Sequence, residues 1–329
     1  MSDAATLSAP APRLRAGSRP LPRRRRRIGS RAGVKASGFE GQLVPLLLLA
    51  PQLLILLLFF FIPAVRVLIQ AFTLQDPFGQ EVIFVGLENI LALLRSAEYH
   101  ASVRISVVFT LATTALTLGV GLVLAFATDR VLRLRSAYRT VLLLPYAIAP
   151  AVAGILWAFL FNPVVGPAAF LLHALGIPWN PTRIGDHAMV LVVLAASWKH
   201  VCYNFIFLLA ALAAVPRAVI EAAAVDGATP LRRFLAIQLP MIMPTVFFLV
   251  VMNVVHGLFE TFAIIDATTR GGPAAATSIL VYKVYLDGFV NLDLGGSAAQ
   301  SLLLMVFAIV LTVIQFRAID RRVSYDVAQ

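Results

Sequence analysis

Long apolar segments separated by short polar stretches dominate the pattern of this chain. Six of them are long enough to cross about 30 Å of hydrocarbon as helices. Backbone N–H and C=O groups must be paired in lipid, so such segments are predicted to be helical. The pattern predicts an all-α, polytopic membrane protein with six transmembrane helices, at about residues 43–65, 102–127, 140–161, 188–215, 241–266 and 298–316.

The polar interruption at residues 216–240 has an ordered pattern of its own. After Pro216, good helix formers run to Asp226, and Gly227 is placed to end that helix in a left-handed conformation. Thr229 and Pro230 are a typical N-cap and first helical residue, so a second short helix is predicted to start there and to end at Pro240. The result would be a compact docking element rather than a plain connecting loop, which is the alternative interpretation.

Two shorter stretches outside the long segments are also apolar. Residues 170–176 and 278–289 have the composition of short helices lying at the outer membrane surface, although ordinary loop packing would explain them equally well.

Polar side chains also occur inside the apolar segments, where a charged group costs about 2.5–3.5 kcal/mol at a helix centre. Helical spacing groups them on shared faces, and we interpret these faces as a translocation path. The alternatives are that Lys199 pairs with Glu260 or with a second subunit, or that it extends to the membrane surface. The candidate path residues are Lys199, Tyr203 and Asn204 (with His200 beside Asn204), then Asn253, His256 and Glu260, and finally Gln300.

Composition supports the membrane class, and charge indicates the orientation. Hydrophobic residues make up 60% and charged residues 13%, against about 45–50% and about 25% in soluble domains. Ten of the Lys and Arg residues lie in residues 1–42, a predicted disordered cytoplasmic tail. The basic bias of the alternate connections places both termini and residues 216–240 in the cytoplasm. The predicted organisation is the tail at 1–42 and a six-helix domain at 43–323, with its core at about 98–317.

Candidate chemistry is sparse. No glycine-rich phosphate-binding loop is present, the single cysteine allows no intrachain disulfide, and the five histidines are scattered. We therefore expect no enzyme activity, no metal site and no bound cofactor in this chain, and we expect any energy source to be a partner protein.

The spacing of residues 221–240 resembles the cytoplasmic "EAA loop" of ABC importer membrane subunits. The matching residues are Glu221-Ala222-Ala223, Gly227, Ile237 and Leu239-Pro240. Further stretches, including Leu143 to Val152, Trp198-Lys199 and Gly271-Gly272-Pro273, are similar to the carbohydrate-type permeases and above all to the A-type membrane subunits of sn-glycerol-3-phosphate uptake systems.

This resemblance implies a type I importer fold in the bacterial inner membrane, with part of the translocation path for sn-glycerol 3-phosphate or a glycerophosphodiester. The implied partners are a second homologous permease subunit, a cytoplasmic ATPase dimer that uses ATP and Mg, a periplasmic or extracellular solute-binding protein, and membrane lipid, with no nucleic acid. The implied ATPase-coupling residues are Glu221, Ala222, Ala223, Asp226, Gly227, Arg232, Arg233, Ile237, Leu239 and Pro240.

Two other functions remain open at this point. One is an ABC permease for a neutral di- or oligosaccharide, because the 216–240 pattern concerns the ATPase and carries no information about the solute. The other, from a different class, is a secondary transporter driven by an ion gradient, for which Glu260 is the main candidate residue.

Overall fold

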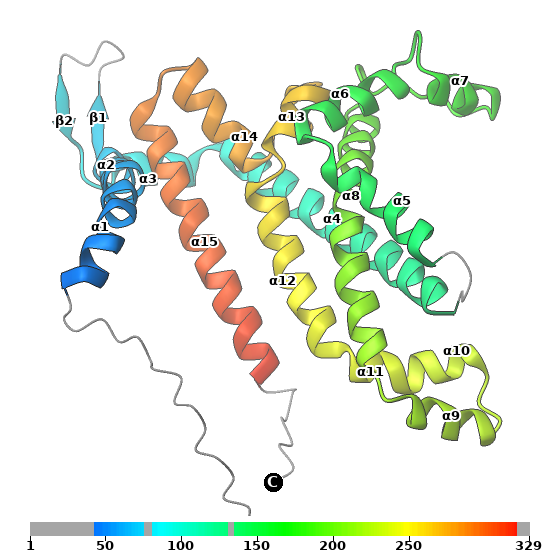
Figure 1. Ribbon diagram of the computed structural model, residues 1–329. Helices are drawn as coiled ribbons and strands as arrows, with labels where there is room; N and C mark the ends of the chain where they lie inside the picture. The colour runs from blue at the N-terminus through cyan, green and yellow to red at the C-terminus, as the bar shows by residue number, and fades with distance from the viewer. Residues whose placement is uncertain (1–42, 76–80, 131–134, 321–329) are drawn as a thin grey trace, which may run out of the picture. The chain divides into compact units, whose positions relative to one another are not determined.

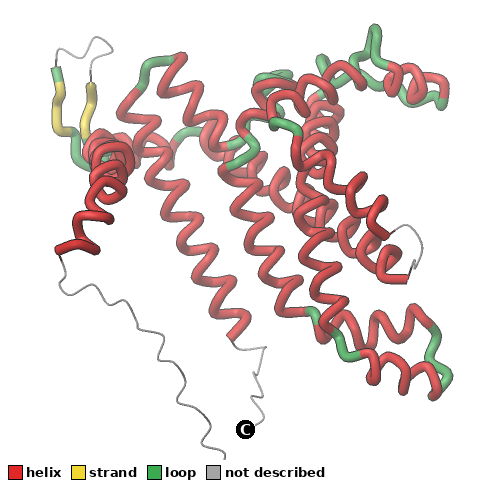
Figure 2. Tube along the Cα trace, in the orientation of Figure 1, coloured by secondary structure: helices red, strands yellow, loops and turns green. Residues whose placement is uncertain are grey.

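The computed structural model describes residues 43–75, 81–130 and 135–320, and these are mostly helical (Figure 2). The predicted tail at residues 1–42 lies outside the described residues. The chain divides into two compact units, the first ending at Leu58 and the second beginning at Phe59. The first unit contains α1 (Leu43–Leu56), whose side chains are apolar and exposed from Leu46 onward, as expected of a helix surrounded by lipid.

Four helical stretches are long and apolar enough to cross a membrane as single spans. The stretch Leu46–Gln70 joins α1 to α2 (Ile62–Gln70) through a π-helical turn at Leu57–Phe61. The other three are α4 (Ala97–Arg130), α8 (Gly185–Ala214) and α15 (Leu294–Asp320). They correspond to four of the six predicted segments.

The other two predicted segments are bent pairs of helices. One pair, α5 (Arg135–Ala147) and α6 (Pro150–Leu160), turns by 103°. Ala149 has the extended ψ of 139° that a following proline favours, so the helix breaks where a continuous one was predicted. With each pair taken as one span, the described part of the chain contains six.

The second bent pair contains the end of the 216–240 segment. Its first part comprises α10 (Pro230–Arg233), a π-helical turn (Phe234–Gln238) and α11 (Leu239–Met241), and it meets α12 (Met243–Phe259) at 71°. The helix predicted for 241–266 therefore ends at Phe259, and α13 (Phe262–Thr268) follows as a separate element.

The connections contain the remaining elements. Helices occur at both apolar stretches outside the spans, as α7 (Pro167–Ala174) and as α14 (Leu280–Tyr285) with the π-helical turn Leu286–Val290. Helix α3 (Glu88–Arg95) precedes α4, and α9 (Arg217–Val225) follows α8. A two-stranded antiparallel hairpin, β1 (Thr73–Gln75) with β2 (Val82–Phe84), is a small addition to the predicted all-α class.

The core of the second unit forms where α4 packs along α8 and crosses α12 (Figure 1). Small residues allow this close packing, as is usual between membrane helices. A Cβ atom on Gly121 of α4 would lie 2.9 Å from the Cβ of Asn204, and one on Gly257 of α12 would lie 3.0 Å from Thr110. The 216–240 segment connects α8 to α12, and both of these helices carry predicted path residues.

Candidate functional site

The 216–240 segment begins with α9, which ends as its sequence predicts. Gly227 has a φ of +79°, and the Ala228 N–H donates to the Ala223 carbonyl at 3.0 Å. This hydrogen bond closes a helix C-terminus through a left-handed residue. Glycine is favoured at position 227 because a side chain would strain that backbone conformation.

The second helix of the segment starts as predicted but continues further. Thr229 Oγ1 accepts the Arg232 N–H at 3.4 Å, and Pro230 occupies the first helical position. The prediction that Pro240 ends this helix is wrong. Pro240 lies in the first turn of α11, where a missing N–H has little cost, and the bend comes two residues later at Ile242.

The segment has a buried side and an exposed side. Phe234 and Gln238 are buried, and the Phe234 ring lies 4.3 Å from that of Phe126 on α4. The sequence analysis missed Phe234, although a large aromatic residue within a polar connecting segment is a usable signal of burial. The predicted coupling residues are exposed at Glu221, Ala222, Asp226, Gly227, Arg232 and Pro240, and partly buried at Ala223, Arg233, Ile237 and Leu239.

The predicted path residues separate into three groups. The first lines a cavity of about 560 Å³ near the middle of α8, between α8, α12 and the corner of α5 and α6. Lys199 Nζ donates to the Tyr146 carbonyl at 3.2 Å and lies 5.3 Å from the centre of the Tyr146 ring. The predicted residues at this cavity are Lys199, Tyr203, His256 and Glu260.

Two further residues line this cavity: Tyr146, which was absent from the predicted path, and His200, which was named there only as the neighbour of Asn204. Tyr146 comes from the bent α5–α6 pair, and no sequence pattern indicates it. His200 stacks on His256 with ring centroids 3.8 Å apart and an interplanar angle of 9°. His256 Nδ1 lies 3.0 Å from Glu260 Oε2, and Lys199 makes no ion pair with Glu260 in the described part of the chain.

The second group, Asn204 and Asn253, is buried between helices and does not line the cavity. Their side-chain amides exchange two hydrogen bonds, of 3.0 and 2.7 Å. Thr117 Oγ1 of α4 donates to Asn253 Oδ1 at 3.0 Å. The two asparagines therefore join α4, α8 and α12 in a shared polar contact.

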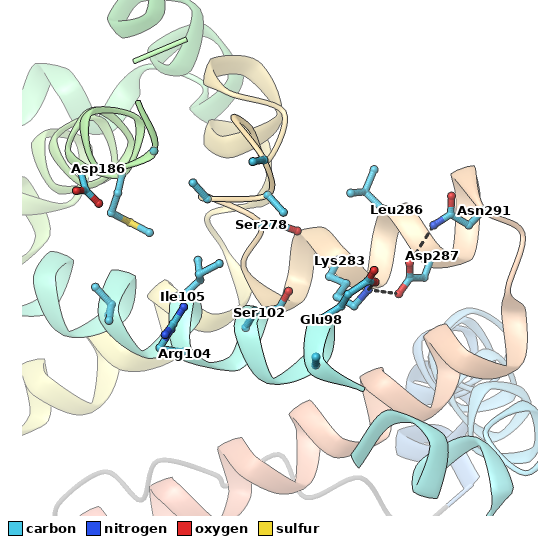
Figure 3. A pocket seen from close by; sticks show the side chains of 18 residues that line it. Glu98, Ser102, Arg104, Ile105, Asp186, Ser278, Lys283, Leu286, Asp287 and Asn291 are labelled. Carbon is cyan, nitrogen blue, oxygen red and sulfur yellow. Dashed lines mark hydrogen bonds and ion pairs between the residues drawn. The ribbon is translucent and has the colours of Figure 1, made fainter. Parts of the chain in front are cut away.

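The third group is Gln300, which lies in another cluster. Its Nε2 donates to Asp287 Oδ2 at 2.6 Å, and Lys283 pairs with Asp287 at 3.0 Å and with Glu98 at 3.7 Å. This cluster borders a larger cavity of about 830 Å³ at the start of α4 and α8, where Figure 3 shows Lys283 between Glu98 and Asp287. The structure does not bring Gln300 to Lys199.

The described residues contain no group of three or more potential metal ligands. The chemistry available at the smaller cavity is that of one ammonium, one carboxylate, two imidazoles and two phenol groups, arranged around a space that fits a small polar solute.

Residues 117–325 match the family of binding-protein-dependent transport system inner membrane components. The chain is 51% identical over 287 residues to the "sn-glycerol-3-phosphate transport system permease protein UgpA" of Rhizobium meliloti (strain 1021), covering 87% of this chain and 98% of that protein. It is 49% identical over 289 residues to the protein of the same name from Yersinia enterocolitica, covering 88% and 98%.

Solved structures confirm the fold. A bacterial ABC transporter involved in the import of the acidic polysaccharide alginate has a chain with a TM-score of 0.73 at 21% identity, covering 86% of this chain and 96% of that one. The alginate transporter in complex with its pentasaccharide-bound periplasmic protein gives 0.70 at 21% identity, with 83% and 92% covered. The chain therefore belongs to the family of binding-protein-dependent transport system inner membrane components.

Proposed function

We propose that this chain is the permease subunit of an ATP-driven importer of sn-glycerol 3-phosphate and that its smaller cavity forms part of the solute path. The observation that carries the proposal is the partly buried residue Lys199, which lines a 560 Å³ cavity near the middle of a spanning helix. A cation is costly at that depth, and an anionic solute explains why it is there. The names of the relatives that share about half of its residues support the choice of glycerol phosphate.

The cavity offers partners for both ends of such a solute. An ammonium group has three donors, and the Tyr146 carbonyl uses one of them, so two remain for phosphate oxygens. The Glu260 carboxylate is exposed and can accept hydrogen bonds from glycerol hydroxyl groups. The phenol of Tyr203 lines the same space and can donate or accept.

The exposed side of the 216–240 segment would be the contact with a separate ATPase. Glu221 and Asp226 present carboxylates there, and the neighbouring alanines allow a partner to approach closely. The buried side links the segment to α4 and α8 through Phe234, which shares a hydrophobic cluster with residues of both helices. In this mechanism the ATPase dimer uses ATP and Mg, and a second permease subunit and a solute-binding protein complete the importer.

The test is uptake in a bacterial host that lacks its own glycerol phosphate transporters and expresses this chain with its partner subunits. We expect uptake of sn-glycerol 3-phosphate that depends on ATP. Lys199→Gln removes a charged hydrogen bond worth about 1.5–3 kcal/mol, so uptake should fall by about tenfold or more, whereas Lys199→Arg keeps the charge and should retain more activity.

Two results would contradict the proposal. If the importer takes up a neutral disaccharide and no glycerol phosphate, the proposed solute is wrong and the neutral sugar is the substrate. Unchanged uptake by Lys199→Gln, at normal levels of the assembled complex in the membrane, would remove Lys199 from the path.

A further inference from the structure

The stacked histidines at the solute cavity are an unusual arrangement within a spanning bundle. His200 of α8 and His256 of α12 are parallel and 3.8 Å apart, and only His256 contacts a carboxylate, that of Glu260. Both Nε2 atoms are buried, and no described residue forms a hydrogen bond with them. Within the described part of the chain, no side chain or carbonyl therefore stabilises an additional proton on either Nε2.

The charges around this stack come from a small set of groups. Lys199 is positive and Glu260 is negative, while Tyr146 and Tyr203 are the other titratable residues that line the cavity. Helix α4, which packs against both α8 and α12, contributes the uncharged Thr110 beside Gly257. Two imidazolium rings 3.8 Å apart would repel each other strongly at low dielectric, so the pair can accept one proton but not two.

We propose that the His200–His256 pair takes up one proton when a phosphate monoester dianion enters the cavity, and that it thereby favours monoesters over diesters. This inference rests on the proposed function. Lys199 and Glu260 together carry no net charge, so a dianion would bring two uncompensated negative charges into a partly buried space. One proton on the histidine pair compensates one of these two negative charges. A diester brings a single negative charge and gains less from the proton.

The sign of the resulting pH dependence follows from linkage. Because binding takes up a proton, affinity for the monoester must fall as pH rises. The second ionisation of a phosphate monoester lies near about pH 6, so the free solute stays a dianion above about pH 7. Between about pH 7 and pH 8.5, affinity for the monoester falls as pH rises, by at most about tenfold per pH unit, which is the slope for one whole proton taken up per solute.

The experiment measures solute binding by calorimetry to the purified complex of this chain and its partner subunits, without ATP or binding protein. The ligands are sn-glycerol 3-phosphate and a glycerophosphodiester, each over about pH 7–8.5, where the charge of both free ligands is constant. We expect monoester affinity to fall severalfold across this range and a much flatter profile for the diester.

Three variants test which groups are responsible. His256→Gln should flatten the monoester profile, because it removes the imidazole that Glu260 contacts and leaves His200 with no neighbouring carboxylate. Glu260→Gln should flatten it as well, since the cavity then carries a positive charge before the solute arrives; its side chain is 68% exposed, so the fold is insensitive to this change. His100→Gln is the matched control, an exposed histidine outside the cavity, and should keep the full dependence.

The outcomes separate this inference from the proposed function. A flat monoester profile in the unmodified complex, with binding that Lys199→Gln weakens, would overturn the inference alone. A steep profile that persists in both His256→Gln and Glu260→Gln, or equal slopes for monoester and diester, would also overturn it. If no glycerol phosphate binds at all, the proposed function itself is contradicted.

Discussion

At the scale of single residues, the polar side chains inside the spans perform two different tasks. Lys199 and His256 line a cavity, whereas the side-chain amides of Asn204 and Asn253 form hydrogen bonds with each other between helices. Helical spacing places all four on inward faces, but it cannot show which polar group meets another. The structure therefore leaves fewer residues in the predicted path, and it assigns the two asparagines to the association of helices.

We expect Asn253→Leu to destabilise the complex, because it leaves the buried Asn204 amide without its partner. An unpaired buried amide costs about 1–3 kcal/mol, although polar contacts between membrane helices often measure about 0.6 kcal/mol. The measurement is the thermal unfolding midpoint of the purified complex in detergent.

The double variant Asn204→Leu with Asn253→Leu provides the control for this prediction. Replacing both amides with apolar groups of similar size should recover part of the lost stability. If the two single changes were simply additive in the double variant, the amide pair would have no coupling energy and the assignment would be wrong.

At the scale of elements, the sequence predicted the helix ends that depend on interactions between residues close together in the chain. Gly227 and Thr229 define the ends of α9 and α10 through hydrogen bonds within a few residues, and both predictions are confirmed. The break before Pro150 was not predicted, because prolines are often tolerated inside membrane helices when neighbouring groups satisfy the backbone. The stack of His200 on His256 depends on how α8 and α12 are rotated against each other, which no single segment encodes.

Gly227→Val tests whether the turn after α9 serves coupling. A Cβ at this position meets nothing within 4 Å, so the substitution acts through its φ of +79° and through the altered surface. We expect ATP-coupled uptake, and the association of the ATPase with the permease on co-purification, to fall severalfold or more.

Gly176→Val is a matched control for that change. Gly176 also has a φ of +79° and no atom within 4 Å of its would-be Cβ, but it follows α7. It should impose similar backbone strain and leave ATPase association intact. Equal losses from the two substitutions would show that strain, and not a docking surface, explains the effect. An unaffected Gly227→Val would show that the turn after α9 is not needed for coupling.

At the scale of the whole molecule, the orientation in the membrane is a prediction from Lys and Arg, and it can be tested with cysteines. Cys202 is the only cysteine and is buried, so a Cys202→Ser background is suitable for labelling. Val225 at the end of α9 is 88% exposed, and Val164 between α6 and α7 is 74% exposed.

We expect a membrane-impermeant maleimide added to intact cells to label Val164→Cys and not Val225→Cys, which should react only after the inner membrane is permeabilised. The reverse pattern would invert the topology and place the 216–240 segment on the wrong side for a cytoplasmic ATPase.

The uninterrupted length of α8 has a mechanical consequence. Its 30 residues form one helix that begins beside the larger cavity, carries Lys199 near its middle and leads into α9. Lys199 lies about 23 Å from the α9 end at 1.5 Å per residue, so a tilt of about 10° pivoting there moves its backbone sideways by about 4 Å. A small rotation at the α9 end of α8 would therefore produce a displacement of several ångströms at the backbone of Lys199.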